Sequence, residues 1–238
     1  AAPAFAQVNN TSTVGQTGTD GQVTVSQAGG GATSTVTQGG DDNFVRVEQS
    51  GTGAVSTVEQ DNGTQSSDDD NQAYVTQNGA STSFVRQTND FAYADVDQTG
   101  NGNDSEVRQS GDLDYAKVEQ FDGNNTSEIL QSGNLNDAIV RQSVGGNTSE
   151  IEQSSGLNLA IVDQTNLNNQ SSIVQRGVGA NQANVLQSGT GNMSDIAQGG
   201  AGNEAGTAAV RGVTQSGNNN QSFVAQEGGI HEATVTQS

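Results

Sequence analysis

The 238-residue chain contains no cysteine and no tryptophan, and only one proline, one histidine and one methionine. Without cysteine, neither a disulfide nor a thiolate metal site can stabilise the fold. The proline, Pro3, precedes all regular patterning, so no proline interrupts a hydrogen-bonded ladder in the rest of the chain. No apolar run approaches the roughly 18 residues that a membrane-spanning helix needs, and we therefore expect no membrane insertion.

Basic residues are also scarce, with 7 Lys and Arg against 27 Asp and Glu, which gives a net charge of −20. This balance argues against nucleic-acid binding, which needs a basic surface. Combined with a hydrophobic content of only 30%, it is typical of disordered chains. Disorder stays an open alternative for the free monomer. As a final state it does not explain the strict periodicity described next, which favours a folded repeat.

A triplet of Val or Ile, any residue, and Gln recurs along nearly the whole chain. Fifteen of the nineteen gaps between its glutamines are eleven residues, and the others are 17, 10, 12 and 17. The glutamines are Gln16, Gln27, Gln38, Gln49, Gln60, Gln77, Gln87, Gln98, Gln109, Gln120, Gln131, Gln142, Gln153, Gln164, Gln175, Gln187, Gln198, Gln215, Gln226 and Gln237. A fixed period this short indicates one small unit stacked on copies of itself.

Counting back from each glutamine as position 0, position −4 is Ser in odd copies and mostly Ala in even copies. The full period is therefore 22 residues, and twenty halves make ten repeats. Position −6 is usually asparagine. The asparagines that we expect to join the glutamines in the core are Asn103, Asn125, Asn136, Asn147, Asn158 and Asn169.

Positions −6, −4, −2 and 0 share one side of an extended strand and are regular, whereas the opposite side varies and carries most charges. We therefore expect the regular side to face inward. Gly and Asn after each glutamine supply the positive φ angles of a turn. The sequence predicts an all-β fold, a β-solenoid of ten strand–arc–strand coils whose strands form two parallel stacked sheets, as in cross-β structures.

The same period predicts the outward neighbours. Position −3 places Glu106, Glu128 and Glu150 in one outward column, where we expect the like charges to raise one another's pKa. On the other sheet, position −1 places Glu119 next to Arg141.

The repeats predict assembly. Stacked Gln and Asn amides bond to identical amides in the neighbouring coils, about 4.8 Å away, and an end coil lacks such a partner. The repeats run from Asn10 to Gln237 without a polar cap, which a monomeric solenoid needs. We therefore expect a homopolymer formed end to end, with residues 10–238 as one solenoid.

Residues 1–9 are interpreted as a signal-peptide remnant and a short N-terminal segment. Ala4, Phe5 and Ala6 fit the small-x-small rule for signal peptidase. This interpretation is favoured over an extra degenerate coil at Phe5 to Gln7.

The repeats resemble the curlin repeat. One carries Ser105, Gln109, Gly111, Ala116 and Gln120, and the next carries Ser127, Gln131, Gly133, Asn136, Ala138 and Gln142. Curlin repeats usually have Ser six residues before Gln, where this chain mostly has Asn, with Ser two residues later. The resemblance implies a secreted, extracellular, adhesive subunit of a curli-like functional amyloid fibre in a bacterial biofilm matrix. It also implies export through the periplasm and a dedicated outer-membrane channel, and seeding by a nucleator subunit. Family leaders that address this channel precede the repeats, and here only Gln7 to Asn9 would remain to do so.

Other motifs favour structural explanations, and we expect no enzyme activity, cofactor or catalytic site. Six-residue insertions fall between Gln60 and Gln77 and between Gln198 and Gln215. The first, within 61–70, contains Asp68 to Asp70. Its spacing matches neither the EF-hand loop nor the Gly-Gly-x-Gly-x-Asp calcium repeat, so a solvated arc is favoured over a calcium site. His231 takes an asparagine position in the last repeat.

Two alternative functions remain open. A monomeric secreted β-solenoid of the ice-binding or adhesin type would need a flat outward Thr-x-Thr array, whereas the outward columns here are mixed. An enzyme on a parallel β-helix would need clustered acid, base or metal-binding residues outside the core, and none is visible.

Overall fold

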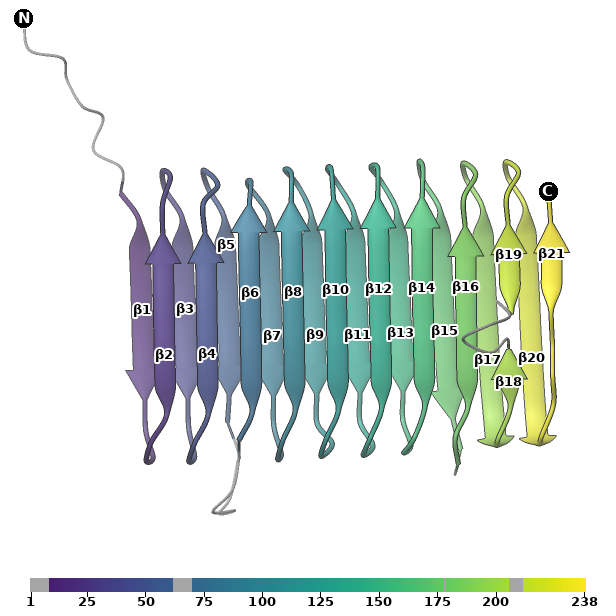
Figure 1. Cartoon of the computed structure of the whole chain (residues 1–238), viewed down its shortest axis with the longest axis horizontal. Coiled ribbons are helices and arrows are strands. Elements are labelled where there is room, and N and C mark those ends of the chain that lie inside the picture. The colour runs from purple at the N-terminus through teal and green to yellow at the C-terminus, as the bar shows by residue number, and fades with distance from the viewer. Residues whose placement is uncertain (1–8, 62–69, 178, 206–211) are drawn as a thin grey trace, which may run out of the picture.

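The computed structural model describes residues 9–61, 70–177, 179–205 and 212–238. Throughout these residues the regular structure consists of β-strands, and the chain alternates between two parallel sheets stacked on each other (Figure 1). The predicted all-β solenoid with two parallel sheets is confirmed. The residues that precede Asn9, which include the proposed cleavage site, lie outside the described residues.

Sheet A contains ten strands: β1 (Thr11–Gln16), β3 (Thr33–Gln38), β5 (Val55–Gln60), β7 (Thr82–Gln87), β9 (Asp104–Gln109), β11 (Thr126–Gln131), β13 (Thr148–Gln153), β15 (Gln170–Arg176), β17 (Met193–Ala201) and β20 (Gln221–Gly229). Sheet B contains β2 (Gln22–Gln27), β4 (Phe44–Gln49), β6 (Gln72–Asn78), β8 (Tyr93–Thr99), β10 (Tyr115–Phe121), β12 (Asp137–Ser143), β14 (Leu159–Thr165), β16 (Gln182–Gln187), β18 (Glu204–Ala205), β19 (Val213–Gln215) and β21 (Val235–Gln237).

The pairing keeps identical residues in register. In sheet A, for example, Ser127 pairs with Ser149, and Gln131 pairs with Gln153. A one-residue slip would turn the apolar side of a strand to solvent, so the alternating pattern fixes this register. The Val and Ile residues at position −2 are almost fully buried from β3 to β19, and they form the centre of the core between the sheets together with the Ala residues at −4.

The connections are tight enough to require glycine at some positions. A Cβ atom added to Gly111 would lie 1.8 Å from the backbone oxygen of Gly133 in the next coil. No side chain fits there without displacing the backbone. The glycine of the Gln-x-Gly pattern is therefore needed for the close approach of neighbouring arcs as well as for the turn.

The two insertions differ in position. β5 ends at Gln60 and β6 begins at Gln72, so the first insertion lies in a connection. Its residues 62–69, which include Asp68 and Asp69, lie outside the described residues, so neither the favoured solvated arc nor the alternative calcium site is tested.

The second insertion interrupts a strand of sheet B and divides it into β18 and β19. β18 pairs with the first half of β16, and β19 pairs with the second half. Asn203 and Ala205 therefore occupy the inward positions −6 and −4 that go with Val213 and Gln215. In the sequence, however, Val213 stands eight positions after Ala205, whereas the residues at −4 and −2 of a regular half-repeat are two positions apart. A count back from Gln215 along the sequence misses both residues.

Candidate assembly core

Two unbroken ladders of glutamine amides run through the interior. The Nε2 atom of each glutamine donates to the Oε1 atom of the glutamine in the next coil of the same sheet, at 2.7–3.0 Å. The sheet A ladder runs from Gln16 to Gln226, and the sheet B ladder runs from Gln27 to Gln237. The structure thus brings all twenty of the glutamines singled out in the sequence into these two ladders.

The second hydrogen of each amide ties the two sheets together. Nε2 of Gln131 in sheet A also donates to the backbone oxygen of Tyr115 in sheet B, at 2.9 Å. Nε2 of Gln142 in sheet B donates to the backbone oxygen of Thr126 in sheet A, also at 2.9 Å. A buried amide is costly unless both hydrogens are bonded, and this geometry bonds both.

Asparagines at position −6 form two further ladders that point the opposite way. The backbone nitrogen of Asn125 donates to Oδ1 of Asn103 in the preceding coil at 3.1 Å, and its Nδ2 donates to the oxygen of Phe121 at 2.9 Å. Asn147 and Asn169 continue this ladder in sheet A. The same bond joins Asn158 to Asn136 beside sheet B. The six selected asparagines are all buried, and they fall into these two separate ladders.

Four more asparagines belong to the sheet B ladder. The nitrogen of Asn71 donates to Oδ1 of Asn43 at 3.0 Å, and the nitrogen of Asn203 donates to Oδ1 of Asn181 at 3.1 Å. Asn43 and Asn71 stand six residues before their glutamines, so the spacing alone identifies them. Asn203 is displaced from that spacing by the second insertion.

Asp114 replaces asparagine in this ladder and is 1% exposed. Its Oδ1 accepts hydrogen bonds from the backbone nitrogen and Nδ2 of Asn136, at 3.0 and 3.1 Å. Its Oδ2 accepts one from the nitrogen of Gly111 at 3.2 Å. Burial raises the pKa of the Asp114 carboxyl to about 6, although these hydrogen bonds favour the charged form. Position −6 predicts that this carboxylate faces inward, but its raised pKa depends on the residues around it in the folded chain.

His231 occupies an asparagine position, as the spacing predicts. Its Nε2 lies 2.9 Å from the backbone oxygen of Glu227, four residues earlier. The asparagine amides make the same contact with the residue four positions before them, for example Asn203 with Gly199. The contact supports a structural substitution in the ladder.

The serines at position −4 form a buried column of hydroxyls. Within the described residues, the Oγ atoms of this column have no hydrogen-bond partner: Ser34, Ser56, Ser83, Ser105, Ser127, Ser149, Ser171, Ser194 and Ser222. An unpaired buried hydroxyl costs about 1–3 kcal/mol. This column therefore fills space between the sheets and stabilises the coils less than the amide ladders do.

Charges lie on the outer faces, where the register confirms the predicted columns. Glu128 pairs with Glu106 and Glu150. The pKa of the Glu128 carboxyl is raised, first by partial burial and then by the negative charges of Glu106 and Glu150. Arg108 acts in the opposite direction.

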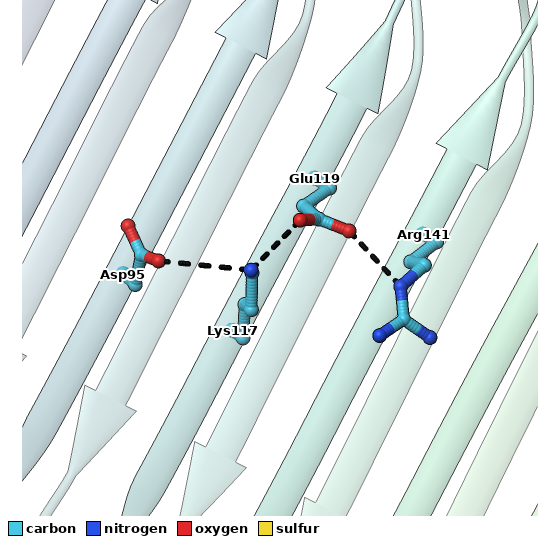
Figure 2. A network of polar contacts seen from close by, with 4 residues as sticks. All are labelled: Asp95, Lys117, Glu119 and Arg141. Atoms are coloured by element: carbon cyan, nitrogen blue, oxygen red, sulfur yellow. Dashed lines mark hydrogen bonds and ion pairs between the residues drawn. The ribbon is translucent and has the colours of Figure 1, made fainter.

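Sheet B carries a chain of opposite charges, Asp95, Lys117, Glu119 and Arg141, across three neighbouring strands (Figure 2). Successive ion-pair distances are 3.9, 2.8 and 3.0 Å. Burial alone would raise the pKa of Glu119, but the hydrogen bonds and charges of Lys117 and Arg141 outweigh it and lower that pKa. These contacts are partly exposed and contribute less than about 1 kcal/mol each.

An aromatic run on the same outer face went unnoticed in the sequence. The rings of Phe44, Tyr74, Tyr93 and Tyr115 follow one another with centroids 5.3–5.5 Å apart. Tyr74 stands at position −3 and the other three stand at −5, so no single column of the repeat contains them.

Across the described ranges, no group of three or more His, Cys, Asp and Glu side chains could hold a metal ion. The same ranges contain no helix with the length and apolar character that crossing a bilayer requires. What the arrangement does offer is four amide ladders that any further coil with the same inward residues can extend.

Comparison with known families gives one match. Residues 212–238 match the family model of the curlin associated repeat, and this segment contains β19, β20 and β21. No curated protein matches the chain. The match supports the resemblance of the repeats to the curlin family, whose members are extracellular, and a curlin repeat is characteristic of curli-type subunits.

Proposed function

We propose that this protein is a structural subunit of an extracellular, curli-like functional amyloid fibre, in which copies stack end to end. The observation that carries the proposal is the identity of the inward columns from coil to coil. Every coil offers Gln and Val or Ile in the same register, and position −4 holds Ser in sheet A and Ala in sheet B, except for Val in β2 and β4. The coil of one copy can therefore continue the ladders of another.

The direction of the ladders supports a head-to-tail joint. Gln16 and Gln27 stand at the start of the two glutamine ladders in the described chain, where their Oε1 atoms face away from the following coils. Gln226 and Gln237 stand at the other end. Stacking β20 and β21 of one copy on β1 and β2 of the next brings the Nε2 donor of Gln237, which donates to the oxygen of Gln221 in the single chain, to the Oε1 acceptor of Gln27. In sheet A, Nε2 of Gln226 already donates to the oxygens of Glu204 and His231, so its bond to His231 must break before Gln226 can extend the ladder.

The edge strand β1 has the exposure that a joint requires. All of its residues are exposed, and its inward residue Val14 is 45% exposed, whereas the equivalent Val36 in the next coil is fully buried. Edge strands with free hydrogen-bonding groups add further strands. A second copy stacked on β1 would give β1 a neighbour on both sides. Val14 would then be buried as Val36 is in β3, which lies between β1 and β5.

Adhesion within a biofilm matrix, export through the periplasm by a curli-type outer-membrane channel, and seeding by a nucleator subunit complete the proposal. The curlin repeat at residues 212–238 supports these roles by family resemblance. Polymerisation is the part that the chain's own geometry makes directly testable.

The test compares two variants of β1. Val14→Asp places a charge on the inward side, where stacking would bury it, and Thr13→Asp places the same charge on the outward side of the same strand. Both side chains are exposed in the single chain, so both variants should fold as the wild type does. We expect wild-type protein to form unbranched fibres with a diffraction spacing of about 4.8 Å.

Val14→Asp should slow assembly at least tenfold, because a joint weakened by about 1.4 kcal/mol already changes the equilibrium tenfold. Thr13→Asp should stay within about twofold of wild type, as expected for an exposed surface change. Wild-type protein that stays monomeric at high micromolar concentration would refute polymerisation. Equal slowing by both variants would refute the proposed joint.

A further inference from the structure

One edge of the solenoid carries a line of exposed apolar residues, Phe91, Leu113, Leu135 and Leu157, here called the apolar stripe. They are 45%, 53%, 50% and 56% exposed. Each lies in the connection that follows a sheet A strand, from β7 to β13, and these connections run along the lower edge in Figure 1.

The stripe is straight because the connections are hydrogen-bonded to one another. The nitrogens of Leu113, Leu135 and Leu157 each donate to a backbone oxygen in the preceding connection, at 2.9–3.0 Å. The four side chains therefore follow one another at the spacing of the coils, about 4.8 Å.

Each stripe residue adopts a backbone conformation that suits glycine or asparagine. The φ angles of Phe91, Leu113, Leu135 and Leu157 are 58°, 58°, 63° and 64°. Bulky L-residues are strained in this left-handed region. The stripe therefore combines backbone strain with exposure of large apolar side chains at the same four positions.

The fold itself does not require apolar residues there. On the opposite edge, the corresponding positive-φ residues of the same coils are Gly102, Asn124, Gly146 and Asn168. On the stripe's own edge, two earlier coils have Asp20 and Asp42 in this conformation. An aligned apolar surface that the fold does not need marks a contact site.

We propose that the apolar stripe is a lateral contact between two copies of this chain, which joins neighbouring filaments side by side in antiparallel orientation. This inference rests on the proposed function, because it assigns the stripe to filaments. A two-fold contact uses the same surface of both partners. It places Phe91 against Leu157 and Leu113 against Leu135.

Charge selects the antiparallel arrangement. The residues that precede the stripe residues are Asp90, Asp112, Asn134 and Gly156, so only one half of the stripe is acidic. Antiparallel contact sets the acidic half of each copy against the uncharged half of the other. Parallel contact would bring Asp90 and Asp112 against their own copies, which like-charge repulsion opposes.

The size of the stripe restricts this contact to filaments. Four half-exposed side chains offer far less than the roughly 800 Å² per partner of a stable interface, so two single chains would separate. In a filament every copy presents one stripe at the same axial interval, and many weak contacts then act together. Single chains should therefore remain unpaired while filaments pair.

The test replaces the two central residues with the Leu113→Asn and Leu135→Asn double variant. Asparagine suits the positive φ angle, so the variant should fold with at least wild-type stability. The matched control is the Val144→Asn and Leu167→Asn double variant, which removes two exposed apolar residues from connections on the opposite edge. Filament pairing is counted in negative-stain micrographs, and circular dichroism checks folding.

We expect the stripe variant to form fibres at the wild-type rate, with the fraction of paired filaments at least fivefold lower and the control unchanged. Wild-type fibres that lie singly, or a stripe variant that pairs as often as the wild type, would overturn the lateral contact alone. If the wild type formed no fibres, the proposed function would fail, and the lateral contact with it.

Discussion

The buried carboxyl of Asp114 should make the stability of the solenoid depend on pH. Its pKa is about 6 in the folded chain, against 3.8 for an ordinary aspartate. Between these values the unfolded chain loses the proton and the folded chain keeps it, so the free energy of unfolding falls as pH rises. Above about pH 6 the Asp114 carboxyl is charged in the folded and in the unfolded chain, and the folded chain bears the full cost of burying that charge.

The size of the effect follows from the shift. One pKa unit corresponds to about 1.4 kcal/mol, so a rise of roughly two units costs about 3 kcal/mol at neutral pH. Asp114→Asn removes this cost and restores the residue that neighbouring coils have at the same position, such as Asn136 and Asn158. The difference in free energy of unfolding between the variant and the wild type should therefore shift in favour of the variant by about 3 kcal/mol between pH 4 and pH 7.

The assay is urea unfolding of freshly dissolved, unassembled protein between pH 4 and pH 8. The control is Asp112→Asn, which removes the same charge two residues away at a half-buried position in the same connection. This control should keep most of the wild-type dependence on pH, because the charge of Asp112 contributes least to the raised pKa of Asp114 and burial contributes most. If Asp114→Asn and wild type differed by a constant amount across the whole range, the reasoning from burial would be refuted.

Three further predictions concern the inward and outward sides of the strands. Gln131→Ala should destabilise the chain by about 1–3 kcal/mol, because it leaves the amides of Gln109 and Gln153 without a ladder partner. Ser127→Ala should be neutral or stabilising, since the hydroxyl that it removes is unpaired. Urea midpoints that fell equally in both variants would contradict the stabilising role of the glutamine ladder. Arg141→Ala, on the outer face, should cost less than about 1 kcal/mol. Glu128→Gln should reduce the gain in stability of the folded chain toward mildly acid pH, because partial burial and the charges of Glu106 and Glu150 raise the pKa of the Glu128 carboxyl within the single chain, so that folding takes up a proton; urea midpoints with an unchanged dependence on pH at low salt would disprove this.

Most of the interior could be predicted because its columns repeat. The period of 22 residues and the alternation of a strand determine which residues stack, so the ladders of Gln131, Gln142 and Asn125 needed no tertiary information. The outward column of Glu106, Glu128 and Glu150 followed from the same period. Repetition supplied the long-range contacts that a single sequence usually conceals.

The remaining features depend on contacts that the period does not encode. The aromatic run alternates between positions through Tyr74, so it becomes visible only when neighbouring strands are placed side by side. Asn203 and Ala205 were missed because the insertion that follows them changes the count but leaves the pairing with β16 intact. Burial of Asp114 follows from its position, but the raised pKa depends on the balance between desolvation and the hydrogen bonds from Asn136 and Gly111, which only the folded structure reveals.

The paired glutamine ladders also determine how the solenoid responds to mechanical force. Each boundary between neighbouring coils is crossed by a glutamine link in each sheet in addition to the backbone bonds, as between Gln131 and Gln153. Tension along the axis loads all of these bonds at once, and they must break together. A sideways pull on an end strand such as β1 loads them one after another. The solenoid should therefore resist stretching far better than peeling, and damage should begin at its ends.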